Sequence, residues 1–120
     1  MTATENSIQL VRAAARAADA KKAEGIVALD VSAHLPLADA FVIASASNER
    51  QVVAVAQAVE EELHLQGVKA VRREGMREGR WALLDFNDVI VHVMHEEERA
   101  YYELERLWKD CPVIPVETGE

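Results

Sequence analysis

Two histidines and a run of glutamates supply the side chains with the clearest metal-binding chemistry in this sequence. His92 and His95 carry imidazole nitrogens and residues 96–98 are all glutamates, and both groups are zinc ligands in proteins. Residues 89–94 are mostly β-branched or otherwise apolar, which predicts a strand. Side chains three residues apart on a strand point to opposite faces, so we do not expect the two histidines to bind one ion. His92 is expected to be a hydrogen-bonding histidine of the sheet.

The carboxylates of Asp85 and Asp88 raise a second possibility, magnesium-dependent nucleotidyl transfer. Enzymes of that class have mixed sheets, a Gly-Ser pair that opens a helix, and two carboxylates one residue apart on a strand. Here the helix opens with Ala46-Ser47-Asn48, and the two carboxylates are three residues apart across a turn. One magnesium ion needs ligands that converge on one octahedron, and this spacing does not provide them. A nucleotidyltransferase is therefore the disfavoured alternative.

Nucleophilic and phosphate-binding patterns are equally weak. Ser45 and Ser47 precede a helix without the Gly-x-Ser-x-Gly pattern of a hydrolase, and Ser47 or Asn48 is expected to cap that helix. Cys111 has no obvious base nearby, which favours a structural thiol. Gly75 and Gly79 lie in a strand-to-strand turn, not at a helix N-terminus, so they do not predict a phosphate loop. These patterns thus predict no catalytic residue, metal or cofactor.

The charge balance restricts the class of partner. Thirteen basic and 21 acidic residues give a formal net charge of −8 at pH 7. Nucleic-acid binding draws most of its affinity from basic side chains that neutralise phosphates, so a protein partner with a basic surface is favoured. A single cysteine fits the reducing cytosol, no apolar run is long enough to span a membrane, and the N-terminus lacks a signal peptide's apolar core. We expect a soluble, cytoplasmic protein.

The expected elements form one domain over residues 1–120, with a core over about 5–109 and an irregular tail over 110–120. Periodicity and turn residues predict helices over 5–22, 48–66 and 96–108, and strands over 26–31, 39–46, 68–74, 81–86 and 89–94. The first two strands read as buried on both faces. The second strand, the long helix and the third strand should form a crossover unit with parallel strands, and the last three strands should be antiparallel. The fold class is α/β (α+β), a mixed five-stranded sheet with flanking helices.

Residues 81–108 are the part around which the rest of the chain is expected to be organised. Asn87-Asp88 suits a two-residue turn between two strands. In the helix that follows, Tyr101, Leu104 and Trp108 recur at helical spacing, and we expect them to pack on the sheet as one apolar stripe.

A series of short segments between residues 30 and 108 carries a family resemblance. They are LDV (29–31), ADAFVIA (38–44), RQV (50–52), EG (74–75), GRWALLDF (79–86), VHV (91–93), RAYYELE (99–105) and LW (107–108). In this order and spacing they resemble the ribosomal silencing factor (Iojap, RsfS) family. The chain departs from the family pattern at Ala40 and Phe86, where tyrosine is usual, and at Met94, where phenylalanine is usual.

The resemblance implies a non-enzymatic regulator of translation. Members of the family are similar to nucleotidyltransferases in sheet topology but lack the active site. They bind the large ribosomal subunit through ribosomal protein L14 (uL14) and prevent the small subunit from joining, which lowers translation when nutrients are short. Some form homodimers when free, and organelle relatives assist large-subunit assembly, which is the alternative role.

The hairpin and the last helix contain the expected partner-binding residues, because Trp and Tyr dominate interface hot spots. We expect Trp81, Leu83 and Asp85, on one face of their strand, to contribute together with Tyr102 and Glu105 of the helix. Tyr102 lies off the predicted apolar stripe. For Trp81 and Leu83 the alternative is burial in the core, since aromatic residues on strands usually pack inward.

Overall fold

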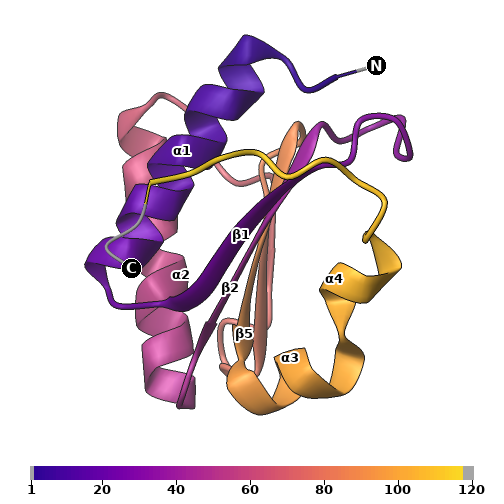
Figure 1. Ribbon diagram of the computed structural model, residues 1–120. Coiled ribbons are helices and arrows are strands. Elements are labelled where there is room, and N and C mark those ends of the chain that lie inside the picture. Colours follow the sequence, from indigo (N-terminus) through magenta and orange to yellow (C-terminus); the bar gives the residue numbers. More distant parts are fainter. Residues whose placement is uncertain (1, 118–120) are drawn as a thin grey trace.

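A five-stranded mixed sheet organises the computed structural model, which describes residues 2–117 (Figure 1). The elements are α1 (Glu5–Ala20), β1 (Glu24–Asp30), β2 (Ala40–Ala46), α2 (Glu49–Leu65), β3 (Arg72–Glu74), β4 (Trp81–Asp85), β5 (Val89–His95), α3 (Glu96–Tyr102) and α4 (Leu104–Leu107). The predicted class, a mixed α/β fold with five strands and flanking helices, is confirmed. Within residues 2–117, no helix combines the length and the apolar composition that crossing a membrane requires.

The strands lie in the order β1-β2-β5-β4-β3. Only β2 and β5 pair in parallel; the other neighbours are antiparallel. The prediction that β2 and β3 run parallel is confirmed. The two strands are not neighbours, however, because β5 and β4 lie between them. The compositions explain this order: β5 is an apolar strand that is buried almost throughout, whereas all three residues of β3 are charged and exposed. Charged side chains are suited to a sheet edge.

Helices cover the two faces of the sheet unequally. Figure 1 shows α1 and α2 side by side on one face, with α3 and α4 on the other. The first face holds the larger core, in which the inward side chains of α1 and α2 meet those of β2, β4 and β5. The second face holds a smaller core around Phe41, Ile43 and Met94, closed by Leu104 and partly by Trp108. Short helices on this side leave part of the sheet surface accessible.

The prediction of a single closing helix over residues 96–108 is wrong. Glu103 adopts a left-handed conformation (φ 47°) that ends α3 and begins α4. The predicted inward stripe is therefore broken: Leu104 is buried and Trp108 packs against the second core, but Tyr101 is 79% exposed.

The first strand agrees with expectation only in part. It lies at a sheet edge and is exposed at its start, but toward its end it is buried on both faces, with Ala28 in the larger core and Leu29 in the smaller one. Residues 112–114 run along this edge, where Leu29 forms an antiparallel bridge with Val113, and the Ile114 N–H donates to the Ala28 carbonyl. Ile114 is buried. The tail thus supplies the pairing that the edge of β1 would otherwise lack.

The helix starts and the hairpin turn follow local sequence rules. Thr4 caps α1 by accepting from the Ser7 N–H, and Asn48 caps α2 by accepting from the Gln51 N–H at 2.9 Å. Of the two expected caps, Ser47 and Asn48, the structure shows Asn48, which is the residue with extended backbone next to the helix. The predicted turn at Asn87-Asp88 is confirmed, with Asn87 at φ 72°.

Candidate functional site

An incompletely covered part of the second sheet face contains three of the predicted residues. Burial alternates along β4: Ala82 and Leu84 are fully buried against the larger core, whereas Trp81, Leu83 and Asp85 on the other face are half-buried. The alternative of core burial holds in part for Trp81, which packs on the second core, whereas the partner-binding role of Trp81 and Leu83 stays a prediction. We call the surface formed by Trp81, Leu83, Asp85, Ile90 and Tyr102 the open face.

Tyr102 joins the open face by contact with Trp81. Their ring centroids lie 5.1 Å apart with planes inclined at 52°, and Tyr101 stands edge-on to Tyr102 at 5.0 Å. Tyr102 is 49% exposed. Three aromatic rings therefore form a continuous series from the sheet to solvent, which is the geometry expected of an interface anchor.

Asp85 lies at the opposite end of the strand from Trp81. One carboxylate oxygen accepts from the Asn87 N–H at 2.8 Å, and the other lies 3.8 Å from an Arg72 nitrogen. Beyond Asp85 the surface continues into a hollow of about 300 Å³ beside the loop that carries Leu37, which is 86% exposed. A negative charge next to apolar surface fits a basic, amphipathic partner side chain.

Glu105 is not part of this aromatic series; it is engaged by Arg99. The Arg99 guanidinium donates to both Glu105 oxygens at 3.0–3.3 Å, to Ser45 Oγ at 3.2 Å and to the Glu24 carbonyl at 3.3 Å. Burial by itself would raise the pKa of Glu105, but the hydrogen bonds and charge of Arg99 lower it. Residues six apart on a straight helix lie about 240° apart around its axis, so the bend at Glu103 is what permits this pair.

Arg99 is a structurally central residue that sequence reasoning did not identify. It connects α3 to α4 and to the ends of β1 and β2, and its side chain is only 13% exposed. Space for it is provided by Gly25, where a Cβ atom would lie 2.7 Å from Arg99 Nη1. Local spacing does not indicate this role, because Glu24 and Ser45 are 75 and 54 residues away.

Replacing Arg99 by alanine is expected to lower the free energy of unfolding by about 2 kcal/mol, because several charge-assisted hydrogen bonds are lost together. Arg106→Ala is the matched control: Arg106 is 76% exposed and only reaches Glu103 at 3.5 Å, so its loss should stay within about 0.5 kcal/mol. Denaturant unfolding of both variants measures the difference. Equal effects would contradict the role given to Arg99.

A second arginine fixes the start of α3. Arg80 Nη2 binds the carboxylates of Glu97 and Glu98 at 2.9 and 2.7 Å, and its Nη1 lies 3.4 Å from Glu49 at the start of α2. The hydrogen bonds to Glu98 and, second, to Glu97 raise the pKa of Arg80 above its ordinary value. The acidic first turn of α3, expected from the helix dipole, is therefore also attached to Arg80, the residue directly before β4, and this attachment places α3 beside Trp81.

His92 and His95 lie three residues apart in β5, so their side chains are on opposite faces of the sheet, as their spacing predicts. His95 is buried and caps α3, its Nδ1 accepting from the Glu97 N–H at 3.1 Å. His92 is also buried, and its Nδ1 accepts from the Trp81 indole N–H at 3.1 Å, so the expected hydrogen-bonding histidine is confirmed. Over residues 2–117, no group of three or more potential ligands is arranged to hold a metal ion.

The remaining nucleophiles are engaged or buried. Ser45 Oγ donates to the Glu24 carbonyl at 3.2 Å while accepting from Arg99. Cys111 is buried in the second core, and burial raises the pKa of its thiol. A raised thiol pKa reduces the fraction of reactive thiolate. Neither side chain has the surroundings of an activated nucleophile.

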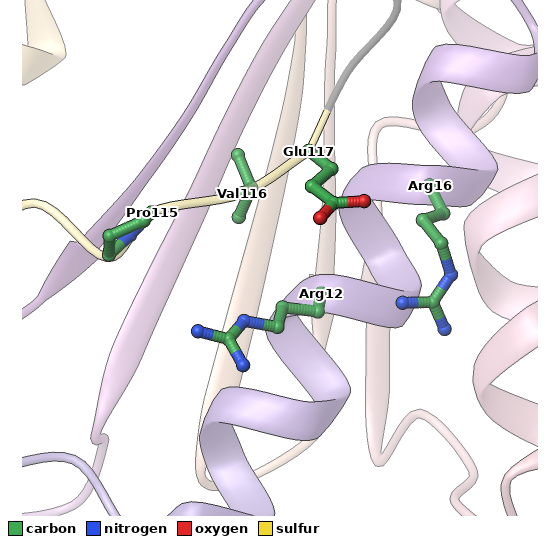
Figure 2. Close-up of a pocket in the computed structure, with 5 residues that line it drawn as sticks. All are labelled: Arg12, Arg16, Pro115, Val116 and Glu117. Atoms are coloured by element: carbon green, nitrogen blue, oxygen red, sulfur yellow. The ribbon is translucent and has the colours of Figure 1, made fainter.

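A groove on the other side of the sheet is a weaker candidate site. It has a volume of about 380 Å³ and lies between α1 and the tail, where Arg12 and Arg16 line it together with Pro115, Val116 and Glu117 (Figure 2). The arginines could attract an anion, but the Glu117 carboxylate on the opposite wall would repel it. The mixed charge and small apolar lining favour the open face as the functional surface.

The comparisons with known proteins agree on one family. Residues 4–120 match the family model described as "Ribosomal silencing factor during starvation". The chain is 43% identical over 109 residues to the ribosomal silencing factor of Halalkalibacterium halodurans, an alignment that covers 91% of this chain and 93% of that protein. It is similar to a crystal structure of a Chromobacterium violaceum protein, with TM-score 0.82, 37% identity and 84% of each chain covered. It is also 30% identical over 91 residues to the mouse protein named "Mitochondrial assembly of ribosomal large subunit protein 1", covering 73% of this chain and 40% of the mouse protein.

Proposed function

Because this chain belongs to the ribosomal silencing factor family, we propose that it represses translation by binding the large ribosomal subunit and blocking access of the small subunit. The observation that carries the proposal is the open face, where Trp81 and Leu83 are half-buried and Tyr102 is exposed on an otherwise well-packed fold. Tryptophan and tyrosine anchors of this kind contribute a large share of the binding energy in protein interfaces, and the apolar surface of Leu83 adds to the area that is buried. The mechanism is occlusion and needs no chemical step, so we propose that the protein is not an enzyme.

We propose that the docking partner is a protein of the large subunit, ribosomal protein L14 (uL14), with little direct contact to RNA. The net charge of −8 makes approach to bare RNA unfavourable, because RNA binding relies on basic side chains. Asp85 at the rim of the open face would meet a basic side chain of the partner. Glu105 contributes indirectly, because its carboxylate is already bound by Arg99 and holds α4 in place.

A subunit-joining assay tests this function. Purified protein is added to large subunits before small subunits, and association is followed by light scattering. We expect association to be suppressed in proportion to the amount of protein bound. Free association of the subunits while the large subunits are verified to carry bound protein would overturn the proposal, as would a complete lack of binding to large subunits.

Leu83→Ala and Asp85→Lys are each expected to weaken binding to large subunits about tenfold, the first by removing apolar contact and the second by reversing a rim charge. Leu65→Ala and Glu61→Lys are matched controls, because they make the same changes at exposed positions of α2 on the other side of the sheet. Affinities are measured by co-sedimentation, and folding is checked by thermal unfolding. Equal losses in the variants and their controls would remove the open face from consideration.

A second candidate function is assistance in large-subunit assembly through the same contact. The name of the mouse relative favours it. Co-sedimentation with mature and with precursor large subunits separates the two roles, because a silencing factor should bind mature subunits at least as well as precursors. Preferential binding to precursors, without an effect on subunit joining, would favour assembly.

We also propose that the free protein forms a homodimer. Tyr101 and Leu107 are 79% and 75% exposed on adjoining short helices near Tyr102, and apolar groups of this size favour burial against a second copy. Sedimentation equilibrium over a range of concentrations gives the oligomeric state. A strict monomer at high concentration would contradict the homodimer without affecting the docking proposal.

A further inference from the structure

The indole of Trp81 is turned so that its polar edge faces inward. Its Nε1–H donates to His92 Nδ1 at 3.1 Å, and the two ring centroids lie 5.9 Å apart. The ring is also in contact with Tyr102. With the N–H satisfied inside the protein, the side of the ring that remains accessible is hydrocarbon.

His92 is buried in a manner that suits this one task. It lies on β5 opposite Leu83 of β4 and Ile43 of β2, and the ring of Phe41 stands edge-on to it at 4.9 Å. Because Nδ1 accepts a hydrogen bond, the proton of the neutral imidazole is on Nε2. That nitrogen is buried without a hydrogen-bond partner among the described residues.

An unsatisfied buried donor destabilises a fold, so on stability grounds an apolar side chain would serve this position better. What histidine provides is an acceptor for the indole of Trp81. Burial lowers the pKa of His92 to about 4, so this acceptor is not protonated near neutral pH. Because Nδ1 accepts from Trp81, the Nε2–H is left buried without a partner, which lowers the stability of the fold.

We propose that His92 is a positioning residue for docking: by holding the Trp81 N–H inward, it presents the apolar edge of the indole, already ordered, to the protein partner. The inference rests on the proposed function, because it concerns how the open face binds. It specifies the chemistry of the contact: the partner meets Trp81 with aliphatic or aromatic groups and not with a hydrogen-bond acceptor. Ordering the ring before binding reduces the entropy lost on association.

A double-mutant cycle tests the coupling between the two residues. His92→Leu removes the acceptor and should weaken binding to large subunits about fivefold, the equivalent of one hydrogen bond. In a Trp81→Phe background there is no N–H to hold, so His92→Leu should change the affinity by less than about twofold. His92→Asn places an amide oxygen near the position of Nδ1 and should restore binding to within about twofold of wild type.

A second measurement on the free protein separates positioning from a general loss of structure. Hydrogen exchange of the Trp81 indole N–H, observed by NMR, should be slow in the wild type and in His92→Asn and fast in His92→Leu. Thermal unfolding verifies that all variants are folded, and the indole of Trp108 serves as an internal reference.

The outcomes separate this inference from the proposed function. Equal fivefold losses from His92→Leu in the wild-type and Trp81→Phe backgrounds would overturn the positioning role, as would unchanged indole exchange in His92→Leu. If Leu83→Ala weakens binding while His92→Leu does not, only the positioning role fails. If the wild-type chain does not bind large subunits, the proposed function fails and the inference fails with it.

Discussion

Gly75→Ala is expected to lower the free energy of unfolding by about 3 kcal/mol or more. Gly75 has φ +76°, and a Cβ atom there would lie 1.9 Å from the Trp81 carbonyl oxygen and 2.8 Å from its carbonyl carbon. Backbone atoms of a paired strand cannot move away as a flexible side chain can. The substitution should therefore displace the start of β4 and with it the Trp81 ring, weakening docking as well as stability.

Gly67→Ala provides the control for backbone strain alone. Gly67 also has a positive φ, +88°, but a Cβ atom there would have no neighbour within 4 Å. Its replacement should cost about 1 kcal/mol, the penalty for a left-handed non-glycine residue. Denaturant unfolding measures both variants, and a Gly75→Ala cost no larger than that of Gly67→Ala would disprove the steric argument.

Acidification from pH 6.5 to about 4 is expected to remove about 3 kcal/mol of stability through His92 alone. Burial lowers the pKa of this histidine from 6.5 to about 4. Below pH 6.5 the unfolded chain binds a proton at this side chain that the folded chain does not bind. The stability is therefore complete above the unfolded pKa and is lost as the pH falls toward the folded value.

His92→Leu isolates this contribution, because a leucine does not titrate. Its unfolding free energy should fall less between pH 6.5 and 4 than that of the wild type, whereas His64→Gln, at an exposed position, should follow the wild-type curve. Asp30 and Glu105 have lowered pKa values and act below their ordinary values of 3.8 and 4.5, so their effects appear at the acidic end. Parallel curves for His92→Leu and the wild type would exclude His92 as the source.

The parts of the fold that depend on neighbouring residues were predictable from the sequence. The hairpin of β4 and β5 follows from two apolar runs around Asn87, and the helix starts follow from Thr4 and Asn48 within one residue. The predicted partner-binding residues on β4 share one face because side chains alternate along a strand. Their role in docking stays a prediction.

The parts that depend on distant residues were not predictable. The residues around Glu103 have the pattern of a continuous helix, so the sequence does not indicate the bend there. The bend is accompanied by the ion pair of Arg99 and Glu105, which lie on either side of it. The hydrogen bond from Trp81 to His92 joins the neighbouring strands β4 and β5, and predicting it requires the register between them. The exposure of Tyr101 was not predictable for the same reason, because helical spacing places a side chain against the core only if the helix is straight.

The parallel pairing of β2 with β5 also governs when the chain can become folded. Ala40 is paired with Val89, so the middle of the sheet forms only when residues about 50 positions apart meet. Such distant contacts slow folding, because the entropy of closing a long loop is lost before the contacts between the two strands can stabilise the structure. During synthesis, β1 and β2 can pair as soon as they emerge, but they stay without a central neighbour until three quarters of the chain has been made. An intermediate of that kind exposes the edge of β2, and we expect it to be the species most prone to aggregate.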